Sequence, residues 1–126
     1  MNIFKKTLAT VVMMSALIST SALANSAGDA KVRAAGETTL AKTEEAVNLL
    51  EKNGDKAEIL KLLGEVRQSQ KEFRYEQTER LRQKAGDKLR LAHEALTKDD
   101  NADATSNLKA ALDFYKEMFV VYKKAH

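Results

Sequence analysis

The sequence has no cysteine and no proline among its 126 residues. Without cysteine the chain forms no disulfide, has no thiol nucleophile and offers no cysteine for lipid attachment after an export signal. A small cysteine-free domain must be held together by apolar packing, by a metal ion or by a partner. The lack of proline, together with abundant Ala, Leu, Lys, Glu and Gln, predicts helices throughout.

The sequence also lacks the short motifs that indicate catalysis or cofactor binding. It has no Gly-x-Ser-x-Gly nucleophile elbow, no glycine-rich phosphate loop and no Glu-x-x-His motif of a di-iron bundle. Gly64 and Gly86 stand alone inside helical patterns, where we expect them to permit close packing between helices. The protein is therefore predicted not to be an enzyme and to have no catalytic residue.

Residues 1–24 have the three parts of a secretory signal peptide. Met1–Lys6 carry two lysines and no acidic residue, Thr7–Ile18 carry no charge, and small residues stand at Ala22 and Ala24. This pattern predicts export to the periplasm and cleavage after Ala24. The apolar run is shorter than the roughly 20 residues of a membrane-spanning helix, although an uncleaved N-terminal anchor is the alternative. No later stretch is long enough, so we expect no membrane span in the mature chain.

The charge of the mature chain is nearly balanced. Removal of Lys5 and Lys6 with the signal lowers the formal net charge from +3 to +1. The sequence pI of 9.1 therefore overstates the basicity of the mature protein. An exported chain of this balance is not expected to bind nucleic acid.

The mature chain divides into a flexible leader, residues 25–36, and a helical domain, residues 37–126. Polar turns are expected at Lys52–Asp55, with Asp55 as an N-cap, and at Lys98–Asn101. In the domain, apolar residues recur at helical spacing in four stretches. These features predict an all-α fold, an antiparallel four-helix bundle of two helical hairpins. The four stripes consist of Leu40, Thr43, Val47 and Leu50; Ile59, Leu62, Leu63, Val66 and Phe73; Leu81, Ala85, Leu89, Ala92 and Leu96; and Ala104, Leu108, Ala111, Tyr115, Met118 and Tyr122.

The boundary between the second and third helices is the least clearly marked. No glycine or proline stands between Phe73 and Leu81, although Thr78 is able to cap a new helix. One long helix over residues 56–98 is the alternative, and it would give a three-helix arrangement that needs a partner. Four stretches of similar length favour the closed bundle.

His93 is the candidate metal ligand of the mature chain. It lies at the margin of the third stripe, and Glu94 and Asp87 are near it in the sequence. Tight transition-metal sites draw on several imidazole or thiolate ligands, so these three residues predict a weakly bound divalent metal ion at most. The alternative is an exposed helix histidine without a ligand.

The last helix carries more apolar side chains than one core-facing stripe requires. Phe114, Val120 and Val121 are expected outside the stripe. An apolar surplus of this kind is typical of a homodimer seam, of a ligand cleft or of the docking surface for another protein. A periplasmic or envelope protein is the expected partner.

The stretches 46–55 and 92–101 resemble each other, which indicates two related hairpins. The layout Thr43-Glu-Glu-Ala-Val and Leu50-Glu-Lys-Asn-Gly-Asp, followed by Leu91-Ala-His-Glu-Ala-Leu-Thr-Lys-Asp-Asp, resembles the small metal-binding proteins of the periplasm. The resemblance covers about residues 38–118 and implies a signal-bearing four-helix bundle that binds metal. That family is rich in histidine, and His93 is the residue at a comparable helical position here.

These observations predict a non-enzymatic, periplasmic helical-bundle binding protein. It would act through protein partners or through weak binding of a metal ion. The alternative is a structural accessory of an envelope, secretion or stress-response complex.

Overall fold

The computed structural model describes residues 27–126, and the predicted signal peptide, residues 1–24, lies outside the described residues. The described chain forms α2 (Ala27–Glu51), α3 (Lys56–Lys71), the 3-10 turn η2 (Glu76–Thr78), α4 (Glu79–Thr97) and α5 (Asn101–Ala125). Lys31–His126 pack as one compact unit. The predicted all-α class is confirmed. Within residues 27–126, no helix combines the length and the apolar character needed to cross a membrane.

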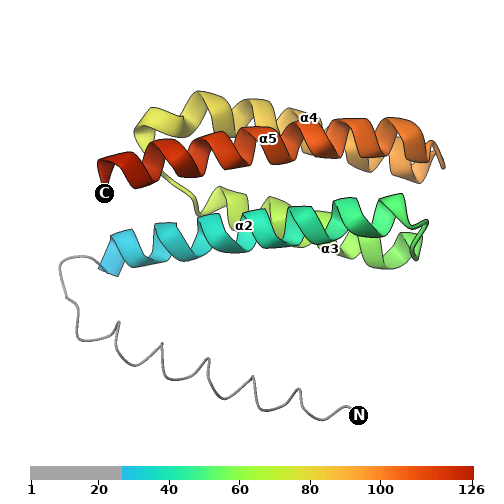
Figure 1. Ribbon diagram of the computed structural model, residues 1–126, viewed down its shortest axis with the longest axis horizontal. Coiled ribbons are helices and arrows are strands. Elements are labelled where there is room, and N and C mark those ends of the chain that lie inside the picture. The colour runs from blue at the N-terminus through green and yellow to red at the C-terminus, as the bar shows by residue number, and fades with distance from the viewer. Residues whose placement is uncertain (1–26) are drawn as a thin grey trace, which may run out of the picture. The chain divides into compact units, whose positions relative to one another are not determined.

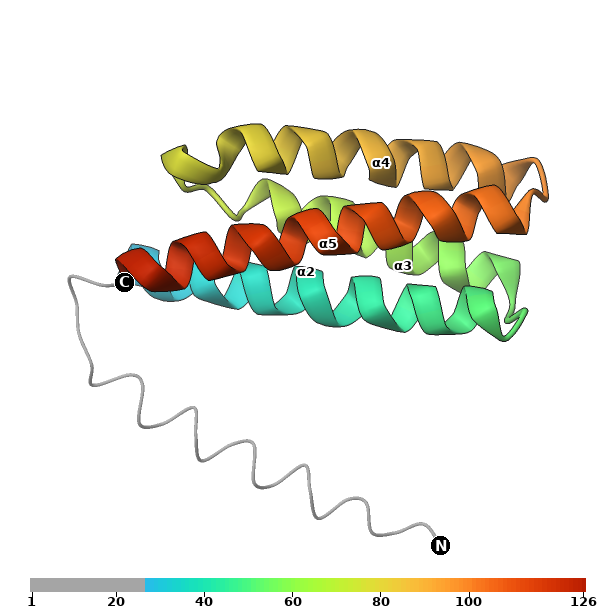
Figure 2. The same ribbon diagram turned by 45° about the horizontal axis from the view of Figure 1, so that its top comes forward.

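The four long helices lie side by side, and each runs opposite to the one before it along the chain (Figure 1, Figure 2). Ion pairs join α2 to both of its neighbours. Lys42 Nζ lies 3.0 Å from Glu65 Oε1 of α3, and Glu51 Oε2 lies 2.6 Å from Lys109 Nζ of α5. The helices therefore form a bundle, in which α3 and α4 meet on the side away from the α2–α5 contact.

Every helix contributes apolar side chains to one core. The stripe predicted for the last helix is buried along its whole length, and Leu108, Ala111 and Met118 have no exposed surface. Burying a leucine or methionine side chain contributes about 1.5–3 kcal/mol. The buried apolar residues are Ala35, Ala46, Val47, Leu50, Ile59, Leu62, Leu63, Val66, Phe73, Ala85, Leu89, Ala92, Ala95, Leu96, Ala104, Leu108, Ala111, Leu112, Tyr115, Met118 and Tyr122.

The α2–α3 and α4–α5 turns have the same backbone geometry. Asn53 and Asp99 both take the left-handed conformation, with φ of 55° and 60°. The N–H of the next residue donates to the carbonyl oxygen of Leu49 in one turn and of Ala95 in the other, at 2.7 and 2.9 Å. This hydrogen bond closes the end of a helix in a Schellman-type arrangement. Equivalent positions are 46 residues apart, in agreement with the similarity seen in the sequence.

An aspartate caps the helix that follows each of these turns. The Asp55 carboxylate accepts a hydrogen bond of 3.1 Å from the N–H of Glu58, which confirms the predicted cap. The Asp100 carboxylate accepts one of 3.0 Å from the N–H of Asp103. Each bond satisfies a first-turn amide that has no partner within its own helix.

The chain breaks between α3 and α4, so the alternative of one long helix over residues 56–98 is wrong. The last turn of α3 tightens, and the N–H of Phe73 donates to the carbonyl oxygen of Gln70 at 3.1 Å. The Phe73 ring is 2% exposed and packs edge-on against Tyr122, with ring centroids 5.6 Å apart. Thr78 stands at the N-cap of α4, but its hydroxyl donates to the carbonyl oxygen of Tyr75 at 2.9 Å. Tertiary packing of an aromatic ring thus replaces the glycine or proline that usually ends a helix.

The helix α2 begins earlier than the sequence predicts. Residues 27–36 were expected in a flexible leader, whereas α2 starts at Ala27. Ala35 is 5% exposed, and Gly36 faces the rings of Phe73 and Phe119. A Cβ at Gly36 would lie 2.8 Å from an atom of either ring. Small residues are typical of a flexible leader, but here the small residue Gly36 lets two aromatic rings approach the backbone of α2.

Candidate ligand-binding cleft

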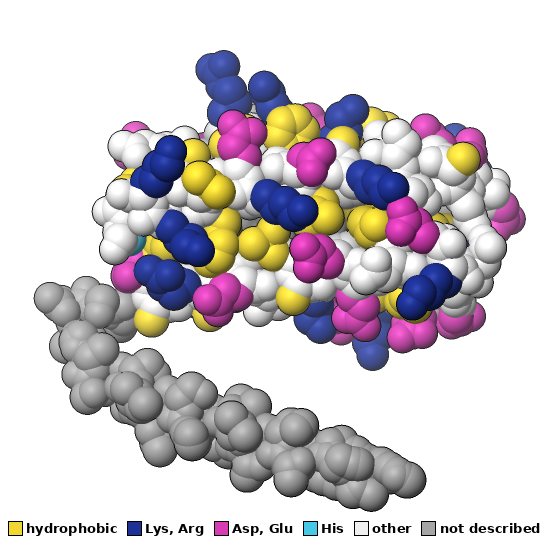
Figure 3. Space-filling view, viewed as in Figure 1, with side chains coloured by type: hydrophobic (Ala, Val, Ile, Leu, Met, Phe, Trp, Pro, Cys, Tyr) yellow, Lys and Arg dark blue, Asp and Glu magenta, His cyan; other side chains and the backbone are white. Residues whose placement is uncertain are grey.

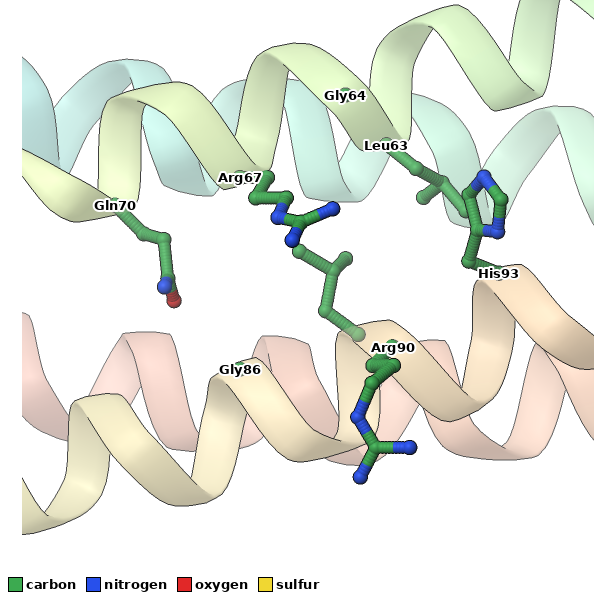
Figure 4. Close-up of a pocket in the computed structure, with 8 residues that line it drawn as sticks. Leu63, Gly64, Arg67, Gln70, Gly86, Arg90 and His93 are labelled. Atoms are coloured by element: carbon green, nitrogen blue, oxygen red, sulfur yellow. The ribbon is translucent and has the colours of Figure 1, made fainter.

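A cleft of 220 Å³ lies between α3 and α4 (Figure 4). On α3, Gly64, Arg67 and Gln70 are three residues apart, and on α4, Gly86, Leu89 and His93 are three and four apart, so each set shares one helix face. Leu63 and Arg90 each stand next to a member of these sets and widen the two faces. The two facing stripes therefore enclose a groove that runs along the contact between the helices. The lining residues are Leu63, Gly64, Arg67 and Gln70 from α3, and Gly86, Leu89, Arg90 and His93 from α4.

The floor of the cleft is apolar, and one of its walls is open at Gly64. Leu63 and Leu89 are 2% and 4% exposed and belong to the core. A Cβ built at Gly64 would meet no atom within 4 Å. One built at Gly86 would lie 3.4 Å from Gln70 Nε2. The expectation that Gly64 permits close helix packing is therefore wrong, because the space beside it is empty.

Three cationic or titratable side chains surround this floor. Arg67 extends from α3 towards α4, and His93 extends from α4 towards α3, whereas the Arg90 guanidinium points away from α3 (Figure 4). Arg90 is paired on its own helix, 3.8 Å from Asp87 and 3.4 Å from Glu94. Among the described residues, Arg67 has no ion pair. Arg67 is thus the cation that is open to a ligand.

Gln70 closes one end of the cleft and connects it with the core. The side chain is 9% exposed, and its Oε1 atom accepts a hydrogen bond of 2.8 Å from the hydroxyl of Tyr115. Its Nε2 atom lies above Gly86, and within the described chain it makes no hydrogen bond. Within the described chain, Nε2 is not one of the fully buried polar atoms that lack a partner, so it is a donor that is accessible from the cleft and can bind an acceptor on a ligand.

The Tyr115 hydroxyl lies deep in the bundle and stays protonated at ordinary pH. Burial raises the pKa of Tyr115 well above its usual value, and the positive charge of Arg82 lowers it by a smaller amount. The neutral hydroxyl is therefore a stable donor to Gln70, and it holds the glutamine amide in one orientation.

The structure separates the three predicted metal ligands. Asp87 and Glu94 lie beside Arg90, and the His93 ring points towards α3 (Figure 4). Within residues 27–126, no three side chains of His, Cys, Asp or Glu are close enough together to hold a metal ion. Weak binding of a metal ion at His93 stays a prediction, and calorimetry with Zn²⁺ on the parent and on His93→Ala tests it.

The predicted partner residues of α5 differ in exposure. Val120 is 51% exposed. Phe114 packs against the core, and Lys84 Nζ lies 6.0 Å from the centre of its ring. Val121 is also partly buried. On the face shown in Figure 3, Lys, Arg, Asp and Glu interrupt the apolar side chains. Docking of a partner on α5 stays a prediction.

Most residues of the cleft were not selected from the sequence. The sequence singles out His93, whereas it marks Leu63 and Leu89 as core residues and Arg67 only as one of several basic residues in the middle of the chain. The one signal was Gln70, a polar residue that interrupts the apolar stripe of α3. A buried glutamine in such a stripe needs a partner, and that requirement would have indicated a polar contact inside the bundle.

Comparison with models of protein families, with curated proteins and with solved structures finds no match for this chain. The class of the protein therefore follows from its fold, which is an all-α helical bundle with a cleft between α3 and α4.

Proposed function

We propose that this chain is a non-enzymatic binding protein and that its ligand occupies the cleft between α3 and α4. The observation that carries the proposal is Gly64. Glycine inside a helix costs about 0.5–1 kcal/mol relative to alanine. Its φ is not positive and no atom lies near its missing Cβ, so neither backbone conformation nor packing requires glycine there. Gly64 is exposed and lines the cleft, so its missing side chain leaves the mouth of the cleft open.

The surroundings of Gly64 add to this argument. The cleft combines an apolar floor with a few polar atoms, which is the usual chemistry of small-ligand sites. None of its lining residues carries a hydroxyl, a thiol or a carboxylate. The cleft therefore has donors that hold a ligand but no nucleophile paired with a base, which supports binding without catalysis.

The compartment is part of the proposal. Cleavage of residues 1–24 would release an antiparallel bundle of two hairpins into the periplasm, where it acts as a carrier or sensor of a small molecule. Kinship with the small metal-binding proteins of the periplasm is proposed on helix spacing alone. A structural role in an envelope, secretion or stress-response complex is the alternative, and its support is the exposed Val120.

Nuclear magnetic resonance tests the location of the site. The mature chain, labelled with nitrogen-15, is titrated with benzyl alcohol and with benzoate, two probes of one ring each. The backbone amides of Gly64 and Gly86 are expected to shift, because both residues line the cleft. The amide of Gly54, in the α2–α3 turn, is expected to stay in place. If neither probe moves the cleft amides, the proposal is wrong.

A variant that fills the cleft gives the second test. Gly64→Leu places a side chain in the empty space and should weaken binding of both probes by about tenfold or more. Because leucine favours helix more than glycine does, this variant should melt no lower than the parent. Ala57→Leu, at an exposed position of the same helix, is the matched control and should bind normally. Unchanged binding by Gly64→Leu would place the ligand elsewhere.

A further inference from the structure

We infer that the ligand of the α3–α4 cleft is a small organic carboxylate with an apolar body. Its body would lie on Leu63 and Leu89, its carboxylate would face Arg67, and Gln70 Nε2 would donate a hydrogen bond to it. The inference rests on the proposed function, because it concerns the same cleft. It specifies the charge and the size of the ligand.

The charge of the ligand follows from the lining. The cleft contains arginine and histidine side chains and no carboxylate. The charge of Arg90 is already paired with Asp87 and Glu94, whereas within the described chain Arg67 makes no ion pair. A guanidinium presents paired N–H donors that match the two oxygens of a carboxylate. An anionic group therefore completes the site, and a cationic one would be repelled.

The position of the anionic group follows from Gln70. Arg67 and Gln70 are three residues apart on α3, so their side chains are neighbours on one helix face. The Gln70 amide is more than nine-tenths buried and is held by Tyr115, and its Nε2 atom lacks an acceptor among the described residues. One carboxylate between the two side chains would accept from both. The polar end of the ligand then lies at the Gln70 end of the cleft.

The size of the ligand follows from the volume. The cleft holds 220 Å³, whereas pockets for drug-sized ligands span roughly 300–1,000 Å³. Leu63 and Leu89 offer an apolar floor of two side chains. One aromatic ring or a short alkyl chain matches this space, and a nucleotide or a long fatty chain exceeds it.

Benzoate and benzyl alcohol form a matched pair for the test, because they share the ring and differ in the charged group. Their dissociation constants are measured from the shifts of the Gly64 and Gly86 amides. We expect benzoate to bind about tenfold more tightly than benzyl alcohol. Raising the ionic strength from about 0.05 M to about 0.5 M shortens the screening length severalfold. This change should weaken benzoate binding and leave benzyl alcohol unaffected.

Two arginine variants assign the preference to a residue. Arg67→Gln should abolish the preference for benzoate, so that the two probes bind with similar affinity. Arg74→Gln removes the same charge at an exposed position outside the cleft and should keep the preference. In the parent protein, benzoate should also shift the side-chain amide signals of Gln70.

The outcomes separate the inference from the function on which it rests. If neither probe moves the cleft amides, the proposed function fails. If both probes bind in the cleft with equal affinity, the function stands and the carboxylate inference is overturned. A preference for benzoate that survives Arg67→Gln, or Gln70 signals that do not move, would also overturn it.

Discussion

Gly36 and Gly64 look alike in the sequence and have opposite surroundings in the bundle. Gly36 faces two aromatic rings so closely that a Cβ would lie 2.8 Å from either. Gly64 faces empty space. The difference comes from the neighbouring helix and not from the residue, and so the sequence could not distinguish a glycine that permits packing from one that leaves a cleft open.

The same substitution should therefore have opposite effects at these two positions. Gly36→Ala forces the rings of Phe73 and Phe119 to move, and overpacking of this kind costs about 1–3 kcal/mol. Gly64→Ala meets no atom and should raise the free energy of unfolding by about 0.5–1 kcal/mol. Urea unfolding of both variants measures the two changes. A loss of stability in Gly64→Ala would show that the space beside this residue is filled in solution.

Tyr115 makes the stability depend on pH in the alkaline range. In the unfolded chain its hydroxyl loses the proton near pH 10, whereas burial raises its pKa in the folded protein. Above about pH 10 the unfolded state binds fewer protons than the folded state. The free energy of unfolding therefore falls with rising pH, by about 1.4 kcal/mol per pH unit from this group.

Tyr115→Phe isolates this contribution. At neutral pH the variant should be less stable by about 1–3 kcal/mol, because Gln70 Oε1 is left buried without a donor. Above about pH 10 the difference from the parent should shrink, since phenylalanine has no proton to lose. Tyr75→Phe, at a half-exposed position, is the control. The effect of this linkage begins at about pH 10. If the difference in stability between variant and parent stays constant from there to about pH 11.5, the Tyr115 hydroxyl is not buried in the folded protein.

At the scale of elements, the helices and the favoured four-helix arrangement followed from apolar spacing, whereas the residues that end α3 did not. The α5 stripe and the Asp55 cap depend on local pattern, so the sequence predicted both. The end of α3 depends on where Phe73 finds a pocket among rings of α5. Such a contact joins residues far apart in the chain, and no local spacing records it.

Phe73 should accordingly be the most sensitive residue of this connection. Phe73→Ala removes a buried ring and should lower the free energy of unfolding by about 3–5 kcal/mol. Arg74→Ala, at the exposed neighbouring position, should change it by less than about 0.5 kcal/mol. Urea unfolding followed by far-ultraviolet circular dichroism measures both. Equal effects of the two substitutions would mean that the ring does not hold the break in place.

At the scale of the whole molecule, the cleft lies between two hairpins whose turns share one geometry. The α2–α3 hairpin supplies one wall and the α4–α5 hairpin supplies the other. A ligand in the cleft therefore contacts both halves of the fold and stabilises the folded state by mass action. The sequence indicated the two hairpins, but the gap between them arises from packing and has no local signature.

Export is the prediction that concerns the full chain. When the gene product is made with residues 1–24 in a bacterium, the periplasmic protein should have an intact mass that begins at Asn25. Signal peptidase requires small residues at the positions occupied by Ala22 and Ala24. The Ala24→Leu variant should therefore keep the signal and stay with the membrane fraction. Full-length parent protein in the membrane would support the N-terminal anchor instead.

The bond between Tyr115 and Gln70 gives the molecule an optical property. The chain has no tryptophan and three tyrosines, so tyrosine dominates its near-ultraviolet spectrum. Tyr115 donates to the amide whose other atom faces the cleft, and hydrogen bonds in a chain polarise one another. An acceptor at Gln70 Nε2 should strengthen the tyrosine bond and shift its absorption. If a ligand binds as proposed, tyrosine absorption should report it without a label, and the Tyr115→Phe variant should lack this signal.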